Sequence, residues 1–249
     1  MKSLLKMTWM EAKLFLREPA SAFFTLIFPL MMLFIYGTIF SNAPMPSGSG
    51  SSQNAIGNLI PSFTAMSIGI VGLMPVTITL ATYRENGVLR RLRTTPVHPL
   101  VVMAAQIIVV FVMTVLGVML LVAAGKLIYD VQFTGNAFSV FAGFIFGSLS
   151  FFGMGFILAS TMPTARTAQI VGMVVMYPML ILSGAGWPRE LMPGAVVKIS
   201  EFLPLTYVVN LLRGLWIGET WGQHTIDIIV LAVMFLVGAF VSVKLFRWE

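Results

Sequence analysis

The chain of 249 residues contains no cysteine, only two histidines and few charged residues. Without cysteine it can form no disulfide, no thiolate metal site and no cysteine nucleophile. Charged residues make up 10% of the chain, against roughly 25% in an ordinary soluble domain. With 58% hydrophobic residues and a mean hydropathy of +0.94, the composition predicts an all-α polytopic membrane protein. The net charge of +6 is therefore a topology signal and not a sign of nucleic-acid binding.

The sequence also lacks a visible source of energy for transport. A phosphate-binding loop needs G-x-x-x-x-G-K-[ST], and the Gly-Lys pair at 125–126 is followed by Leu127. His98 and His224 are too far apart to suggest a metalloprotease site, so we expect no metal or cofactor on this chain. A gradient-driven carrier usually needs ionisable residues at mid-membrane depth. Asp227 lies instead near one end of the last apolar run.

Apolar runs long enough to cross a bilayer recur six times. A membrane helix needs about 20 predominantly apolar residues. The N-terminus lacks a compact apolar core followed by a small-residue cleavage site, so we expect it to be retained. The predicted spans are 21–41, 58–82, 101–125, 137–161, 168–185 and 225–245.

Lysine and arginine predict the orientation of these spans. Eleven of them fall in the N-terminal arm, the loops after spans two and four, and the C-terminus, and four fall in the alternate loops. The positive-inside rule then places both termini and the loop 84–98 in the cytoplasm. The loop 42–57 carries no charge and is predicted to be a flexible connection on the outer side.

The N-terminal arm has two faces when it is drawn as a helix. Lys2, Lys6, Lys13 and Arg17 form one stripe, suited to lipid phosphates at the cytoplasmic surface. Glu11 and Glu18 fall on the opposite face, among apolar residues. We therefore expect these two carboxylates to contact protein.

The stretch YRENGVLRRLRTTPVHP, residues 83–99, concentrates charge between spans two and three. As a helix, Val88, Leu89 and Leu92 form an apolar ridge flanked by arginines, Gly87 permits a sharp turn, and Pro96 ends the helix. A short amphipathic helix held between two spans is suited to a groove of a cytoplasmic partner. The alternative is an ordinary positive-inside loop.

This stretch resembles the loop of type-2 ATP-binding-cassette (ABC) exporter permeases, in which a glutamate-containing turn precedes a Gly-x-Leu-Arg-Arg-Leu-like helix and a Thr-Pro. LREPASAFFTLIFPLMM (16–32) resembles the family's entry into the first span. SGAGWPRELMP (183–193) with LPLTYVVNLLRG (203–214) resembles the segment between spans five and six. The resemblance covers essentially the whole chain in the correct order.

The resemblance implies a half-transporter of the bacterial or archaeal cytoplasmic membrane. Two permease subunits, as a homodimer or with a sister permease, would work with two separate ATPase subunits that bind ATP and Mg²⁺. The arm 1–18 would be an interfacial helix, and the loop 84–98 would carry the coupling helix that meets the ATPase. By motif match, the coupling residues are Arg84, Glu85, Gly87, Leu89, Arg90, Arg91, Leu92 and Arg93.

The resemblance also implies where cargo passes. Segment 186–217 would form short re-entrant helices on the outer side, broken at Pro188, Pro193 and Pro204. Spans two and five would line the path, and their adaptable methionines suit a small lipophilic cargo such as a drug, antibiotic, lipid or glycolipid. The candidate path residues are Phe63, Met66, Met74, Met173, Met176 and Tyr177.

Two other interpretations stay open. The alternatives are a gradient-driven or passive carrier, and a membrane immunity or scaffold protein that transports nothing. Gly143 and Gly147 form G-x-x-x-G in span four, which predicts a close helix contact within the subunit rather than across a dimer.

Overall fold

The structure of the protein is a computed structural model, and it describes residues 2–42, 52–88 and 99–245. All regular structure in these ranges is helical. The long helices are α1 (Lys2–Arg17), α3 (Phe28–Asn42), α4 (Ser52–Glu85), α6 (Pro99–Tyr129), α7 (Ala137–Thr161), α8 (Ala165–Leu182), α10 (Pro204–Ile217) and α11 (Thr225–Leu245). The short ones are α2 (Pro19–Ala22), the π-helical η1 (Phe23–Ile27), η2 (Arg189–Leu191), α9 (Gly194–Ser200) and η3 (Trp221–His224).

Six helical stretches of the described residues are long and apolar enough to cross a membrane, judged by length and composition. They confirm the six predicted spans and make the chain an integral membrane protein. Their bounds are Pro19–Ile39, Ile56–Glu85, Ala104–Tyr129, Ala137–Thr161, Ala165–Leu182 and Trp221–Val241.

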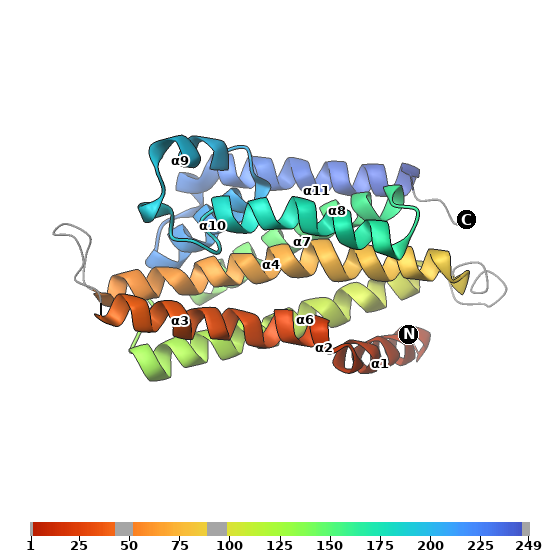
Figure 1. The fold of residues 1–249 in the computed structure, drawn as a ribbon, viewed down its shortest axis with the longest axis horizontal. Helices are drawn as coiled ribbons and strands as arrows, with labels where there is room; N and C mark the ends of the chain where they lie inside the picture. The colour runs from red at the N-terminus through yellow and green to blue at the C-terminus, as the bar shows by residue number, and fades with distance from the viewer. Residues whose placement is uncertain (1, 43–51, 89–98, 246–249) are drawn as a thin grey trace.

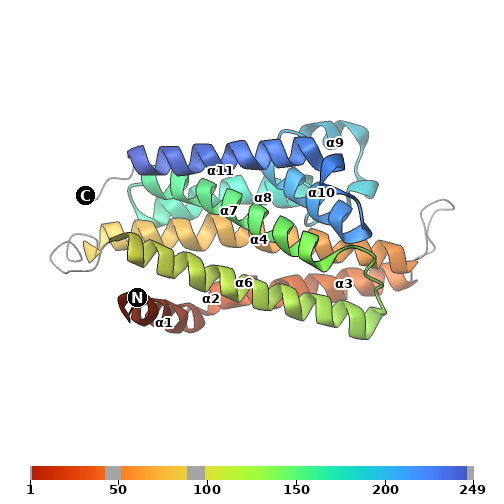
Figure 2. The same cartoon turned by 180° about the vertical axis from the view of Figure 1, so that it is seen from behind.

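The six spans run side by side as one bundle (Figures 1 and 2). Helix α1 and the end of α11 lie at the same end, where α4 ends, α6 begins and α7 turns into α8. We call this the arginine end, because Arg84 and Arg166 lie there. At the opposite end α3 finishes, α4 starts, and α9 and α10 are found.

Helix α4 lies at the centre of the bundle, against α3, α6, α7, α8 and α10. Its closest neighbour is α7, and small residues make the approach possible. A Cβ added at Gly155 of α7 would collide with the carbonyl oxygen of Gly72 in α4. The Thr77 hydroxyl donates to the carbonyl oxygen of Gly155 at 3.0 Å. The two backbones are therefore in direct contact, as small residues allow between membrane helices.

The predicted G-x-x-x-G motif of α7 also faces another part of this chain. A Cβ at Gly143 would lie 2.8 Å from the Leu215 side chain, and one at Gly147 would lie 3.1 Å from that of Val208. Both neighbours belong to α10. The prediction of a contact within the subunit is thus confirmed.

The segment between α8 and α11 contains short helices that meet at sharp angles. Helices α9 and α10 are bent by 100° relative to each other. Pro188 and Pro193 directly precede η2 and α9, and Pro204 is the first residue of α10. Each predicted proline therefore marks the start of a helix, where its missing N–H removes no helical hydrogen bond.

Helix α10 is fixed to the bundle along most of its length. At its start, the side chain of Leu205 packs on Gly69 of α4, 3.1 Å from the position of an added Cβ. Farther along, Arg213 donates from Nε to the hydroxyl of Ser62 in α4 at 2.7 Å. Because Gly69 lies near the middle of α4 and Ser62 lies closer to its start, α10 runs from the interior of the bundle toward the opposite end.

We predict that Gly155→Ala destabilises the bundle by about 1–3 kcal/mol, because the new methyl group must push α4 and α7 apart. Thermal unfolding in detergent would measure this as a lower midpoint. The matched control is Gly194→Ala, since a Cβ at Gly194 meets no atom within 4 Å. Equal midpoints for the two variants would contradict this account of the α4–α7 contact.

Candidate functional site

Arg84, near the end of α4, binds the end of α7. Its guanidinium donates to the carbonyl oxygens of Met162 at 3.1 Å and Ala159 at 2.9 Å. The last carbonyl groups of a helix lack intrahelical donors and carry the negative end of the helix dipole. A cation placed there both satisfies these acceptors and stabilises the helix end.

Glu85 makes the complementary contact with the start of α8. One carboxylate oxygen accepts a hydrogen bond from the backbone N–H of Ala165 at 2.9 Å. The same helix start is capped by Thr164, which forms a capping box with Thr167. Neighbouring residues of opposite charge thus hold the turn between α7 and α8, and α4 is fixed to both helices at the arginine end.

The rest of the predicted coupling group begins just beyond this contact. Gly87 adopts a positive φ of 66°, the left-handed conformation that the predicted turn requires. Arg84 and Glu85 hold the α7–α8 turn of this same chain, and their contact with an ATPase stays a prediction. Leu89, Arg90, Arg91, Leu92 and Arg93 lie outside the described residues.

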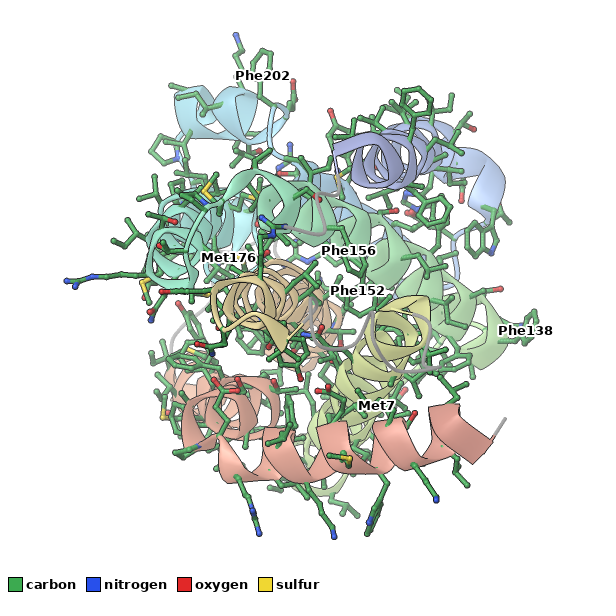
Figure 3. All side chains as sticks on the ribbon, turned by 90° about the vertical axis from the view of Figure 1, so that its right-hand side faces the viewer. Met7, Phe138, Phe152, Phe156, Met176 and Phe202 are labelled. Carbon is green, nitrogen blue, oxygen red and sulfur yellow. The ribbon has the colours of Figure 1, made fainter. Side chains whose placement is uncertain are left out.

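Helix α1 lies across the bundle axis at the arginine end, with its nitrogen-tipped side chains directed away from the other helices (Figure 3). Lys6, Lys13 and Arg17 are exposed, as the predicted basic stripe requires. Glu11 is only 7% exposed, and the Tyr83 hydroxyl of α4 donates to its Oε1 at 2.6 Å. The expectation that the carboxylate of Glu11 contacts protein is therefore confirmed. The same expectation is not confirmed for Glu18, because the side chain of Glu18 is exposed.

Burial raises the pKa of Glu11 above the usual glutamate range, and the hydrogen bond from Tyr83 only partly opposes this. Glu11 and Tyr83 line a small cavity together with Glu18, Pro75 and Gln106. A partly polar joint therefore connects α1 to the bundle, close to the Arg84–Glu85 contact.

A larger cavity of about 180 Å³ lies between the first span, α4 and α8. The π-helical turn η1 forms part of its wall, through Phe24 and Thr25. Such π-helical insertions in α-helices are frequent at functional sites. Most of the remaining lining is apolar, with a few polar side chains at Glu18, Ser21, Thr79 and Gln169.

The cavity brings together four of the six predicted path residues. Met74 comes from α4, and Met173, Met176 and Tyr177 come from one face of α8. Met176 lies between α8 and α4 (Figure 3). Three adaptable methionine side chains around one cavity suit an apolar ligand of variable shape.

Phe63 and Met66 do not line this cavity, although they share a stripe of α4 with Met74. Both are almost completely buried in the main core, at 1% and 2% exposure. Tyr36 packs on Phe63 with 5.8 Å between ring centroids, and its hydroxyl donates to the carbonyl oxygen of Gly186. The segment after α8 and the end of α3 therefore cover the stripe toward the opposite end.

Three polar residues that line the larger cavity, Ser21, Thr79 and Gln169, were not predicted from the sequence. Gln169 lies one turn before Met173, so the helical period of α8 could have indicated it. Glu18 lines both cavities at the arginine end, which spacing alone does not reveal.

A cluster of one histidine and two carboxylates lies elsewhere in the fold. His224 lies between the carboxylates of Asp227, at 2.8 Å, and Glu219, at 2.9 Å. It packs so closely on Gly214 that a Cβ there would collide with its ring. Within residues 2–42, 52–88 and 99–245, no group of histidine, aspartate and glutamate side chains is arranged to hold a metal ion.

Comparison with known proteins gives one family match. Residues 2–217 match the model of the ABC-2 type transporter family. The chain is 25% identical to the probable multidrug ABC transporter permease YbhR of Escherichia coli (strain K12), over 65% of this chain and 44% of that protein. It is 26% identical to the inner membrane transport permease YhhJ of the same organism, over 77% of this chain and 50% of that protein.

A third relative matches along its whole length. The putative transport permease YvfS of Bacillus subtilis (strain 168) is 24% identical over 98% of both chains. The chain spans about half or less of the length of the two Escherichia coli relatives.

We predict that Arg84→Met loosens the turn between α7 and α8. Hydrogen bonds from a charged donor contribute about 1.5–3 kcal/mol, so amide hydrogen exchange in residues 160–168 should accelerate by about tenfold or more. Arg166→Met is the control, because Arg166 lies in the same turn with an exposed side chain. Unchanged exchange in Arg84→Met would show that these contacts do not hold the turn.

We also predict that low pH stabilises the packing of α1 against the bundle. Because the pKa of Glu11 is raised in the folded protein, the folded state binds a proton more readily than the unfolded chain. This contribution to stability is complete at low pH and is lost as pH rises through the raised pKa. In Glu11→Gln, the gap between the unfolding midpoints at pH 5 and pH 8 should shrink.

The control for this measurement is Glu18→Gln. Glu18 directly follows the last residue of α1, and its carboxylate is exposed. That variant should keep the pH dependence of the wild type. A full wild-type gap in Glu11→Gln would assign the pH dependence to other groups.

Proposed function

This chain belongs to the ABC-2 type transporter family, and on that premise we propose that it is a membrane transport permease driven by a separate ABC ATPase. Its cargo is a small lipophilic molecule, which it exports across the cytoplasmic membrane. Two copies of the chain form the path, and both termini and the arginine end face the cytoplasm, where two ATPase subunits bind ATP and Mg²⁺.

The observation that carries this proposal is the connection between the arginine loop and the cavity. Arg84 and Glu85, at the start of the loop, bind the end of α7 and the start of α8. Helix α8 then supplies Met173, Met176 and Tyr177 to the cavity wall. A displacement of the loop by an ATPase therefore reaches both walls, α4 directly and α8 through its first turn.

The character of the cavity supports a lipophilic cargo. Its lining is predominantly apolar, and its volume of about 180 Å³ is below the roughly 300–1,000 Å³ of typical ligand pockets. A drug-sized cargo consequently needs the spans to separate, or a second copy to complete the site. The relatives named as multidrug permeases point to the same class of cargo.

We further propose that segment 186–217 is re-entrant and closes the path at the outer side. The hydrogen bond from Tyr36 to Gly186 and the edge contact of Tyr36 with Trp187 hold this segment over Phe63. Arg189 bridges it internally, through a 3.1 Å hydrogen bond to Asn210. Opening the path to the outside then requires these contacts to separate.

ATP-driven extrusion of a fluorescent lipophilic probe tests the proposal, with the chain and its ATPase reconstituted in liposomes. Met173→Trp should fill the cavity and reduce extrusion at least tenfold while the ATPase stays bound. Ile170→Trp is the matched control, because Ile170 lies on the same helix, is exposed and does not line the cavity. Equal extrusion by the two variants would place the cargo path elsewhere.

The same assay tests the ATPase connection. Leu92→Asp should abolish co-purification with the ATPase and extrusion together, because a charge in the predicted apolar ridge cannot enter a groove. Extrusion that persists with an ATPase unable to hydrolyse ATP would favour a gradient-driven or passive carrier. Protection of cells from a toxin under that condition, without extrusion, would favour an immunity protein.

A further inference from the structure

A second cavity, of about 570 Å³, lies between α4, α6, α7 and α10. Helices α6 and α7, which line this cavity, lie on the face of the bundle that is turned toward the viewer in Figure 2. The cavity of about 180 Å³ described above lies elsewhere, between the first span, α4 and α8. Its wall is almost entirely apolar, with valines and a methionine from α6 facing phenylalanines from α7. Nothing in the proposed transport cycle uses it.

Among the described residues that line this cavity, Lys126 alone is charged. It lies near the end of α6, at the opposite end of the bundle, and its side chain is exposed. It makes no hydrogen bond or ion pair with any residue of the described chain. The rim of a deep apolar cavity thus carries one unneutralised cation.

Trp216 forms part of the same apolar wall. The residue is 7% exposed, and its indole Nε1–H has no acceptor among the described residues. Phe133 packs against the indole, with 4.7 Å between the ring centroids. Because the Nε1 atom itself is covered by protein, the indole contributes apolar surface to the cavity.

The dimensions of the cavity match one leaflet of a bilayer. Lys126 and Val115 both line it and are eleven residues apart on α6, which is about 16 Å along a helix. Half of the roughly 30 Å hydrocarbon core is about 15 Å. An acyl chain whose headgroup lies at the level of Lys126 would therefore extend along the whole apolar wall.

We infer that this cavity binds an anionic phospholipid from the leaflet at the opposite end. Its acyl chain lies between α6 and α7, and its phosphate pairs with Lys126. Charge complementarity selects an anionic headgroup, because none of the described residues that line the cavity is acidic and could pair with the cationic group of a zwitterionic lipid. The inference goes beyond the proposed function, since it requires only that the chain spans a membrane.

Native mass spectrometry of the purified full chain tests the headgroup contact. The probes are phosphatidylglycerol and phosphatidylcholine with identical acyl chains, supplied in equal amounts. Wild type should retain phosphatidylglycerol preferentially, and Lys126→Gln should reduce this preference by about fivefold. Lys198→Gln is the control, because Lys198 is an exposed lysine of α9 at the same end and does not line the cavity.

Filling the cavity tests the acyl-chain site independently of charge. Val118→Trp should abolish selective retention of phosphatidylglycerol, whereas Val112→Trp, on an exposed part of α6 outside the cavity, should preserve it.

Each outcome decides the inference. Loss of preference in Lys126→Gln and Val118→Trp, with both controls like wild type, supports the lipid site. Equal retention of the two lipids by wild type, or a preference unchanged in Val118→Trp, overturns it. Crosslinking of the α6 wall to a second copy of the chain would also overturn it, because the cavity would then belong to a protein interface.

Discussion

Backbone groups in a bilayer find no water to bind, so membrane helices must satisfy their own hydrogen bonds and gain stability from close packing. Here that packing converges on α4, which lies against α3, α6, α7, α8 and α10. Gly72 and Gly155 bring α4 and α7 into backbone contact, and the core forms around them. The positions of the two larger cavities, of about 570 Å³ and about 180 Å³, follow from this packing, because α4 forms one wall of each.

At the arginine end, Arg84 and Glu85 each contact the end of a neighbouring helix. Arg84 binds the carbonyl end of α7 and Glu85 binds the amide end of α8, so each charge has the sign that its helix dipole favours. The buried Glu11 adds the contact with α1. The arginine end is thus held by electrostatics, while the interior of the bundle is held by packing.

Hydropathy predicted the six spans because each helix must be apolar enough to cross lipid, whatever its neighbours are. The two-faced arm and the buried Glu11 followed from helical periodicity. Whether an individual path residue lines a cavity or lies in the core did not follow from periodicity. Met74 and Phe63 share one stripe of α4, and only the position of Tyr36 and the segment after α8 separates a cavity residue from a core residue. The cavity of about 570 Å³ combines α4, α6, α7 and α10, a juxtaposition that no single segment of sequence records.

Pro75 of α4 allows the two ends of the bundle to move at different times. Pro75 lies inside α4, where it removes a backbone hydrogen bond and allows a bend. The part after it carries Arg84 and Glu85, and the part before it is held to α10 by Ser62 and Arg213. A bend at Pro75 can therefore change the arginine end while the opposite end keeps its contacts. Alternating access requires this independence, because one entrance must stay shut while the other opens.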